Sequence, residues 1–238
     1  MRAFNTWAYK REQPSDVVAL ERVVNAAIRA NRPVDFVLYW GKGPRSRVAK
    51  PDLACLDYLG SMATRIEPVH APGARITLVE TDTHARLNGH SEEAIEAYYG
   101  GVSIAAKERG FCCVRLSKLT QEWISSGASA DFGQPDADVL DRLHACAARW
   151  YRGDGSVSEG AARYYEMNMI EKRAVERAFP TAVFVTFNGS EYRGMFPDSL
   201  PIFFMYSVKR GTAVKPWFME EDASSSRSAI AEPVAATA

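Results

Sequence analysis

The sequence has no excess charge of either sign and no long apolar run. Its 238 residues carry 29 Lys and Arg against 29 Asp and Glu, so no global field draws the chain to nucleic acid or to an anionic membrane. Residues 1–10 lack the apolar core of a secretory leader, and no segment approaches the roughly 18 apolar residues that span a bilayer. We therefore expect a soluble, cytoplasmic protein that acts on a small molecule, with no nucleic-acid or membrane partner.

Cysteine and histidine are scarce. The four cysteines, at positions 55, 112, 113 and 146, lack the C-x-x-C spacing of metal and redox sites, so we expect reduced thiols. Asp82, His84 and the later His90 imitate a ligand set of two histidines and one carboxylate, but Asn88-Gly89 turns the chain between the histidines. We expect no metal ion and no bound cofactor.

Helical and strand patterns alternate along the first half of the chain. Apolar residues recur at helical spacing over 15–30, 51–70 and 91–109, and short apolar runs at 34–40, 74–79 and 111–116 predict strands between them. Pro72-Gly73 and Gly110 stand at the breaks. Such alternation is typical of an α/β fold with a Rossmann-like, mostly parallel sheet and helices on both faces.

The second half begins with two predicted helices, over 136–152 and 158–179. Ser156 and Glu159 have the spacing of a capping box at the start of the second helix. Strands are expected over 181–187 and 203–209, with their direction left open. We expect one catalytic α/β domain over 1–221 and a disordered tail over 222–238, where Ser, Ala and Pro predominate.

Polar residues follow the first two predicted strands. Ligands of open α/β sheets bind outside the carboxyl ends of the strands, which brings Trp40, Gly41 and Lys42 to the expected site because backbone amides of a glycine turn can approach a ligand. A plain turn is the alternative interpretation. After the second strand, Glu80 could hold ribose hydroxyls.

Glu80, Asp82 and His84 alternate, so they would line one face if the strand continued. A carboxylate beside a histidine raises the pKa of the imidazole and fixes its tautomer. We therefore expect Asp82 and His84 to be catalytic. A solvated strand end, with Asp82 capping a turn, is the alternative.

Other side chains are assigned to substrate binding by position and chemistry. Residues after the third strand could receive a carboxylate or a phosphate, although surface ion pairs would explain them equally well. Aromatic faces attract cations, so a group of tyrosines would suit a sulfonium or another cationic ligand. The assigned residues are Asn88, Tyr98, Arg115, Ser117, Lys118, Tyr164, Tyr165 and Tyr192.

Dispersed short segments over roughly 36–217 carry a further pattern. They are Pro51-Asp-Leu-Ala-Cys-Leu-Asp-Tyr-Leu59, Pro72-Gly-Ala-Arg-Ile-Thr-Leu78, Ala97-Tyr-Tyr99, Ser207-Val-Lys209 and Lys215-Pro-Trp217. Together with the acidic residues Glu80 and Asp82 after the second predicted strand, they resemble the isonitrile synthase family of pyoverdine and dityrosine biosynthesis. The resemblance implies an enzyme that joins the amino nitrogen of tyrosine or tryptophan to a carbon of ribulose 5-phosphate.

The chain departs from that family at the strand exit, where Thr81-Asp82-Thr83-His84 stands in place of Ser-Asp-Gly. This departure and the shorter length favour a related branch, the azetidine-2-carboxylate synthases of nonribosomal peptide pathways, which cyclise S-adenosylmethionine and release methylthioadenosine. On that resemblance S-adenosylmethionine is the substrate. Asp82 and His84 would hold or deprotonate its amine, and tyrosines would surround its sulfonium. The isonitrile-type condensation, a methyltransferase, a binding module and a homodimer remain open alternatives.

Overall fold

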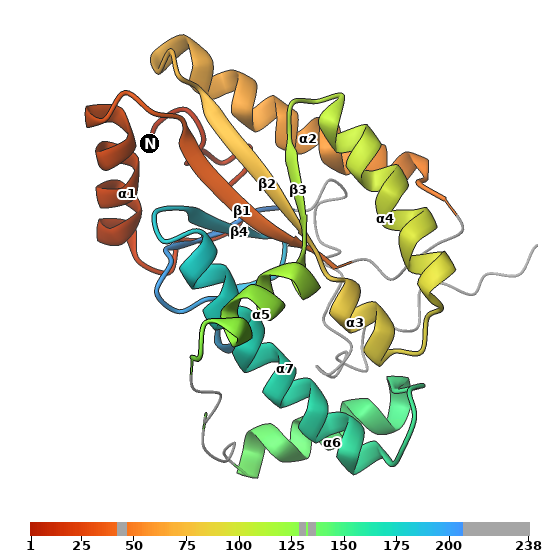
Figure 1. Ribbon diagram of the computed structural model, residues 1–238. Helices are drawn as coiled ribbons and strands as arrows, with labels where there is room; N and C mark the ends of the chain where they lie inside the picture. Colours follow the sequence, from red (N-terminus) through yellow and green to blue (C-terminus); the bar gives the residue numbers. More distant parts are fainter. Residues whose placement is uncertain (42–46, 129–131, 133–136, 207–238) are drawn as a thin grey trace, which may run out of the picture.

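The computed structural model describes residues 1–41, 47–128, 132 and 137–206 (Figure 1). Its sheet has five strands, all parallel, in the order β3-β2-β1-β4-β5. The α/β prediction is confirmed, and the last two strands, whose direction the sequence left open, are parallel. The strands are β1 (Val34–Trp40), β2 (Ala74–Glu80), β3 (Cys112–Arg115), β4 (Val183–Thr186) and β5 (Ile202–Phe204).

Helices cover both faces of the sheet, as predicted (Figure 1). One face carries α1 (Val17–Arg29), α2 (Lys50–Ile66), which continues into the short η1 (Glu67–Val69), and α4 (Glu92–Lys107). The other carries α5 (Leu116–Ser125) and α7 (Val157–Ala178). The remaining helices are α3 (Asp82–Leu87), α6 (Ala137–Trp150) and η2 (Ser190–Met195).

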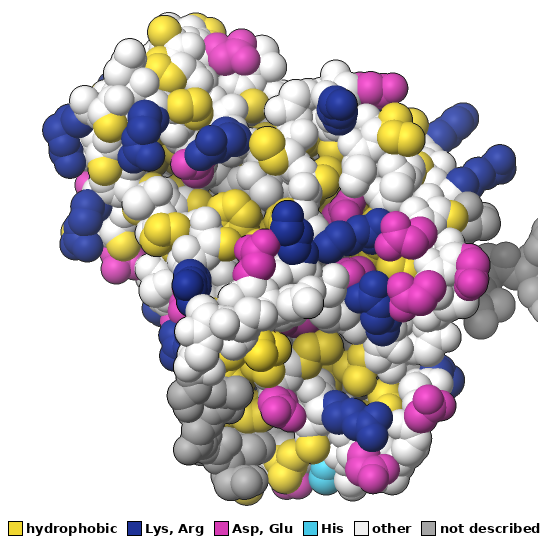
Figure 2. Space-filling model, viewed as in Figure 1, with side chains coloured by type: hydrophobic (Ala, Val, Ile, Leu, Met, Phe, Trp, Pro, Cys, Tyr) yellow, Lys and Arg dark blue, Asp and Glu magenta, His cyan; other side chains and the backbone are white. Residues whose placement is uncertain are grey.

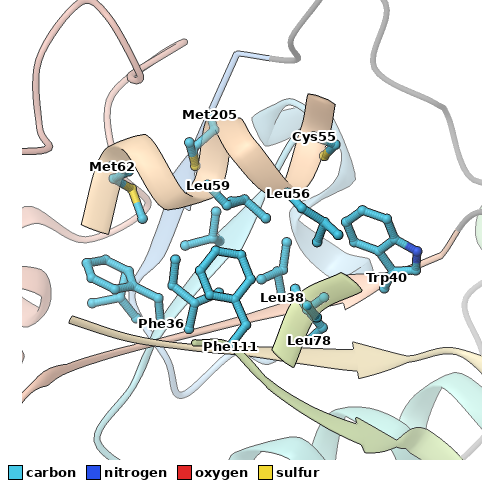
Figure 3. Packing of buried hydrophobic residues seen from close by; sticks show 14 of the residues in the cluster. Phe36, Leu38, Trp40, Cys55, Leu56, Leu59, Met62, Leu78, Phe111 and Met205 are labelled. Carbon is cyan, nitrogen blue, oxygen red and sulfur yellow. The ribbon is translucent and has the colours of Figure 1, made fainter. Parts of the chain in front are cut away.

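The central strand β1 is buried on both sides, which explains its unbroken apolar run. Phe36, Leu38 and Trp40 pack under α2 (Figure 3), whereas Val37 faces the helices of the opposite layer. Fully burying a large apolar side chain contributes about 1.5 to 3 kcal/mol, so these contacts hold β1 firmly in the centre of the sheet. The side chains that follow its carboxyl end therefore start from a rigid base.

Helix starts follow local capping chemistry. The Asp16 and Ser91 side chains accept hydrogen bonds from the first turns of α1 and α4. The predicted capping box at α7 is confirmed, because Ser156 and Glu159 bond each other's backbone amides. No described helix is long and apolar enough to cross a membrane.

The strand order places a topological switch point between β1 and β4. From β1 the chain moves to β2 and β3 on one side, and it later returns to β4 on the other. Ligands of such sheets bind near this reversal, outside the carboxyl ends of the strands. In Figure 1, α3 and the start of α5 lie at these ends, and α6 lies beyond them with the first half of α7.

Some sequence-based predictions need correction, and others fall outside the described residues. The strand did not continue past Glu80, because its partner β1 ends at Trp40 and leaves no ladder to extend; Asp82 instead begins α3. Helix α5 was not expected at all. The last predicted strand, over 203–209, is too long at its end, because β5 ends at Phe204 and the described residues 205 and 206 lie beyond it. Residues 207–209 and the predicted tail over 222–238 lie outside the described residues.

Candidate active site

Asp82 joins the start of α3 to the start of α5. Its carboxylate is 1% exposed, and Oδ1 accepts the Ser117 backbone N–H at 3.0 Å. Oδ2 accepts the Ser117 hydroxyl at 2.5 Å and the Arg86 guanidinium at 2.7 Å. Burial alone would raise the pKa of Asp82, but the hydrogen bonds from Ser117 and Arg86 outweigh it and lower the pKa. Such a carboxylate is a strong structural anchor and a weak base.

His84 is held by a buried carboxylate from a distant helix. Its Nε2 lies 2.7 Å from Oε2 of Glu171 on α7, and the Thr83 hydroxyl donates to Oε1 of the same carboxylate at 2.5 Å. Glu171 is fully buried, whereas the His84 side chain is 22% exposed. With Nε2 directed at Glu171, Nδ1 is the ring nitrogen that can meet a ligand.

Two phenols flank this pair. The Tyr164 ring meets the His84 ring edge to face, with 5.3 Å between centroids, and Tyr39 approaches from β1. Burial, and then the nearby Glu171 charge, raise the pKa of both tyrosines well above the usual value. Both phenols therefore stay protonated at neutral pH, beside an acidic group.

A second polar group lies at the ends of β2 and β3. Glu80 is 2% exposed; it accepts the Ser103 hydroxyl at 2.7 Å and pairs with Arg115 at 3.2 Å. Burial raises the pKa of Glu80 despite these partners. The Arg115 guanidinium also pairs with Glu96 at 3.0 Å and lies 4.8 Å from the centroid of the Tyr99 ring.

These ion pairs extend onto the surface. Arg86 bridges Asp82 and Glu92, just as Arg115 bridges Glu80 and Glu96. Figure 2 shows acidic and basic side chains interleaved over α3 and α4. The two guanidiniums are thus shared among four carboxylates, and Glu171 adds a fifth carboxylate to this edge of the sheet.

Two predicted binding residues lie in the core. The Trp40 indole donates to the Tyr98 hydroxyl at 3.2 Å, which in turn donates to Asp52 at 3.2 Å. Trp40 and Tyr98 are 3% and 0% exposed. Both side chains pack in the core beneath the carboxyl edge of the sheet, where the hydrogen bonds to each other and to Asp52 satisfy their polar atoms without a ligand.

The other predicted residues are dispersed. Lys118 lies on the surface, 69% exposed and 3.9 Å from Glu122, and Tyr165 packs beside α6. A side chain at Gly41 would meet only ordinary contacts. Asn88 donates to the His84 carbonyl at 2.9 Å, and its Oδ1 is buried without a partner among the described residues. Lys42 and the Tyr192 side chain lie outside the described residues.

Three residues of this neighbourhood were missed by sequence reasoning: Tyr39, Asn168 and Glu171. A signal existed in α7. Tyr164, Asn168 and Glu171 follow one another at spacings of four and three, which is the inward stripe of a helix. Polar residues in such a stripe mark a buried polar site rather than a core contact.

No cluster of His, Cys, Asp and Glu with the placement for a metal ion occurs within the described residues. Cys55 is buried, as a core thiol would be, whereas Cys112 is exposed. Burial raises the pKa of the Cys113 thiol to about 11, which leaves little reactive thiolate near neutral pH.

Comparison with known proteins identifies a structural relative. No protein-family model and no curated protein sequence matches the chain. Among solved structures it is similar to the PvcA protein of Pseudomonas aeruginosa, with a TM-score of 0.59 and 19% sequence identity over 89% of this chain and 84% of that chain. At this identity the match shows a shared fold over nearly the whole length of both chains.

Proposed function

We propose that the chain is an enzyme that activates the α-amino group of an amino-acid substrate at the carboxyl edge of its sheet. The observation that carries this proposal is the pair formed by His84 and the buried Glu171. A histidine fixed by a buried carboxylate, with its other nitrogen directed elsewhere, is a suitable proton acceptor near neutral pH.

The contacts of His84 support this role. Glu171 accepts the Nε2 proton, which leaves the Nδ1 lone pair to take a proton from the substrate ammonium. The imidazolium that forms is then stabilised by the same carboxylate. A positioned base of this kind contributes about 10²- to 10⁴-fold in rate. Asp82, engaged with Ser117 and Arg86, positions α3 and therefore His84.

One candidate reaction is an isonitrile-type condensation of an aromatic amino acid with ribulose 5-phosphate. The fold shared with PvcA supports the resemblance to the isonitrile synthase family. It supports this reaction better than it supports the cyclisation of S-adenosylmethionine. In such a condensation the deprotonated amine attacks the carbonyl carbon of the sugar phosphate, the electron pair of the C=O π bond moves to oxygen, and that oxygen leaves as water when the imine forms.

Cyclisation of S-adenosylmethionine is the second candidate, and the charge of the site favours it. Four carboxylates share two guanidiniums at this edge, and Glu171, paired with His84, is a fifth carboxylate there; this acidic excess suits a cationic substrate rather than a phosphate dianion. The amine would lose a proton to His84 and attack its own γ-carbon. The carbon–sulfur bond breaks, and its electron pair leaves with the sulfur of methylthioadenosine, as azetidine-2-carboxylate closes.

A single pair of incubations separates the candidates. Purified protein is incubated with S-adenosylmethionine alone, and separately with L-tyrosine or L-tryptophan plus ribulose 5-phosphate, and products are identified by mass spectrometry. Methylthioadenosine with a four-membered cyclic amino acid supports cyclisation, and an isonitrile supports condensation. If a methyl acceptor is added to the first incubation, formation of S-adenosylhomocysteine from S-adenosylmethionine would indicate a methyltransferase and contradict both. Binding without any product would contradict the proposed activity.

A further inference from the structure

Thr83 holds the carboxylate that orients His84. Its hydroxyl donates to Oε1 of Glu171 at 2.5 Å, and Nε2 of His84 lies 2.7 Å from Oε2. Two consecutive residues of α3 therefore occupy both oxygens of one carboxylate, which α7 supplies from 88 residues further along the chain than Thr83. Two contacts fix the plane of a carboxylate, whereas a single contact lets it rotate. The imidazole thus meets a carboxylate that cannot turn away from it.

The Thr83 hydroxyl is a constant partner of this buried charge. Glu171 is fully buried, and a buried carboxylate is costly unless hydrogen bonds satisfy its oxygens. The neighbouring Lys172 is directed elsewhere, because its ammonium pairs with Asp198 at 2.9 Å. His84 is neutral until it accepts a proton, and its charge changes when it does. Among the described residues, Thr83 is therefore the hydrogen-bond donor to Glu171 that is the same in both states of His84.

We propose that Thr83 is a positioning residue for the base and acts through Glu171. With Oε1 held by Thr83, Oε2 accepts the Nε2 proton of His84, and the Nδ1 lone pair is left for the substrate, because the hydrogen bond at one ring nitrogen sets the tautomer. Without the Thr83 hydroxyl the carboxylate rotates, and the ring can carry its proton on Nδ1, where it is no base. This inference rests on the proposed function, which makes Nδ1 the atom that meets the substrate.

Nuclear magnetic resonance of the protein without substrate tests the inference independently of turnover. With ¹⁵N-labelled histidine, the tautomer of His84 is measured at about pH 8.5, well above the ordinary histidine pKa of about 6.5, and the signals missing in His84→Gln assign it. The wild type should show the Nε2–H tautomer, Thr83→Val a mixture of both tautomers, and Thr83→Ser the wild-type state. Thr81→Val is the matched control, because it removes another buried threonine hydroxyl, which donates to the Trp40 carbonyl at 3.1 Å; it should leave the tautomer unchanged.

Steady-state kinetics provide a second readout. Thr83→Val should lower kcat by about 10-fold or more, a share of the 10²- to 10⁴-fold that a positioned base contributes, with KM within about twofold, and Thr83→Ser should restore it. A single Nε2–H tautomer in Thr83→Val, or an Nδ1–H tautomer in the wild type, would overturn the inference whatever the rates. Thr83→Ala gives the same comparison if the valine variant does not fold. The proposed function fails by a different result, no product from a wild type whose His84 has the Nε2–H tautomer, so the two failures are distinguishable.

Discussion

Replacing Asp82 with Asn tests whether this carboxylate anchors the fold or takes part in the chemistry. The variant keeps one acceptor oxygen but loses the charge, and it turns an amide NH₂ toward the donors of Ser117 or Arg86. Charge-assisted hydrogen bonds contribute about 1.5 to 3 kcal/mol each. The Arg86 contact counts for less, because that side chain is 39% exposed. We expect a loss of about 2 to 4 kcal/mol.

For a chain of this size that loss lowers Tm by about 5 to 15 °C, which a thermal scan of wild type and variant measures. Asp57→Asn is the matched control, since Asp57 also pairs with an arginine but is 65% exposed; its Tm should fall by no more than about 2 °C.

The pH dependence of this difference follows from the lowered pKa of Asp82. A carboxyl whose folded pKa lies below its unfolded value of about 3.9 stabilises the fold fully above about pH 5. That stability is lost as pH falls through the folded pKa, so the Tm gap between wild type and Asp82→Asn should narrow below about pH 4. A variant with wild-type Tm and no turnover would refute the anchoring role and return Asp82 to catalysis.

Two further predictions concern α4 and β3. Gly100→Ala should raise the free energy of unfolding by about 0.5 to 1 kcal/mol, because a Cβ there meets open space. Gly101→Ala should gain less or destabilise the fold, because its Cβ would lie 2.8 Å from the Val48 side chain. Equal gains for the two variants in urea titrations would contradict this packing. Iodoacetamide at pH 8 should alkylate the exposed Cys112 before the half-buried Cys113, whose pKa is raised to about 11. Peptide mass mapping of a short time course shows the order, and modification of Cys113 first would be inconsistent with the described burial.

The alternation of strands and helices could be predicted because it follows from the residue types within and next to each element. Strand β1 is an apolar, β-branched and aromatic run, and Gly73 and Gly110 adopt the positive φ that ends the preceding segment. The parallel direction of β4 and β5 could not be predicted, since short buried strands look alike in either orientation.

The two missed helices share a physical cause. Helix α5 begins at Leu116, directly after β3 ends at Arg115, and α3 begins two residues after β2 ends. Neither boundary has a glycine or proline that would mark the end of a strand, so the sequence pattern predicted that each strand continues where the helix in fact begins. At α5 the Asp82 carboxylate, 35 residues away, satisfies the Ser117 amide, and single-sequence patterns cannot show such a tertiary cap.

The sequence indicated which polar residues follow the strand ends, but not which side chains they contact in the fold. His84 was selected from its neighbours in sequence, yet its described partner is Glu171, 87 residues further on. Only tertiary packing brings the two together. The polar stripe of α7 was visible as a pattern, but its partner across the fold was not.

His84, oriented by Glu171, is proposed to accept the substrate proton. The most direct measurement is the kcat of product formation by His84→Gln, whose amide can still donate to Glu171 but cannot accept a proton near neutral pH. We predict a fall of about 10²- to 10⁴-fold with Tm within a few degrees of wild type. A correctly folded His84→Gln protein that turns over substrate within threefold of the wild-type rate would show that His84 is not the base.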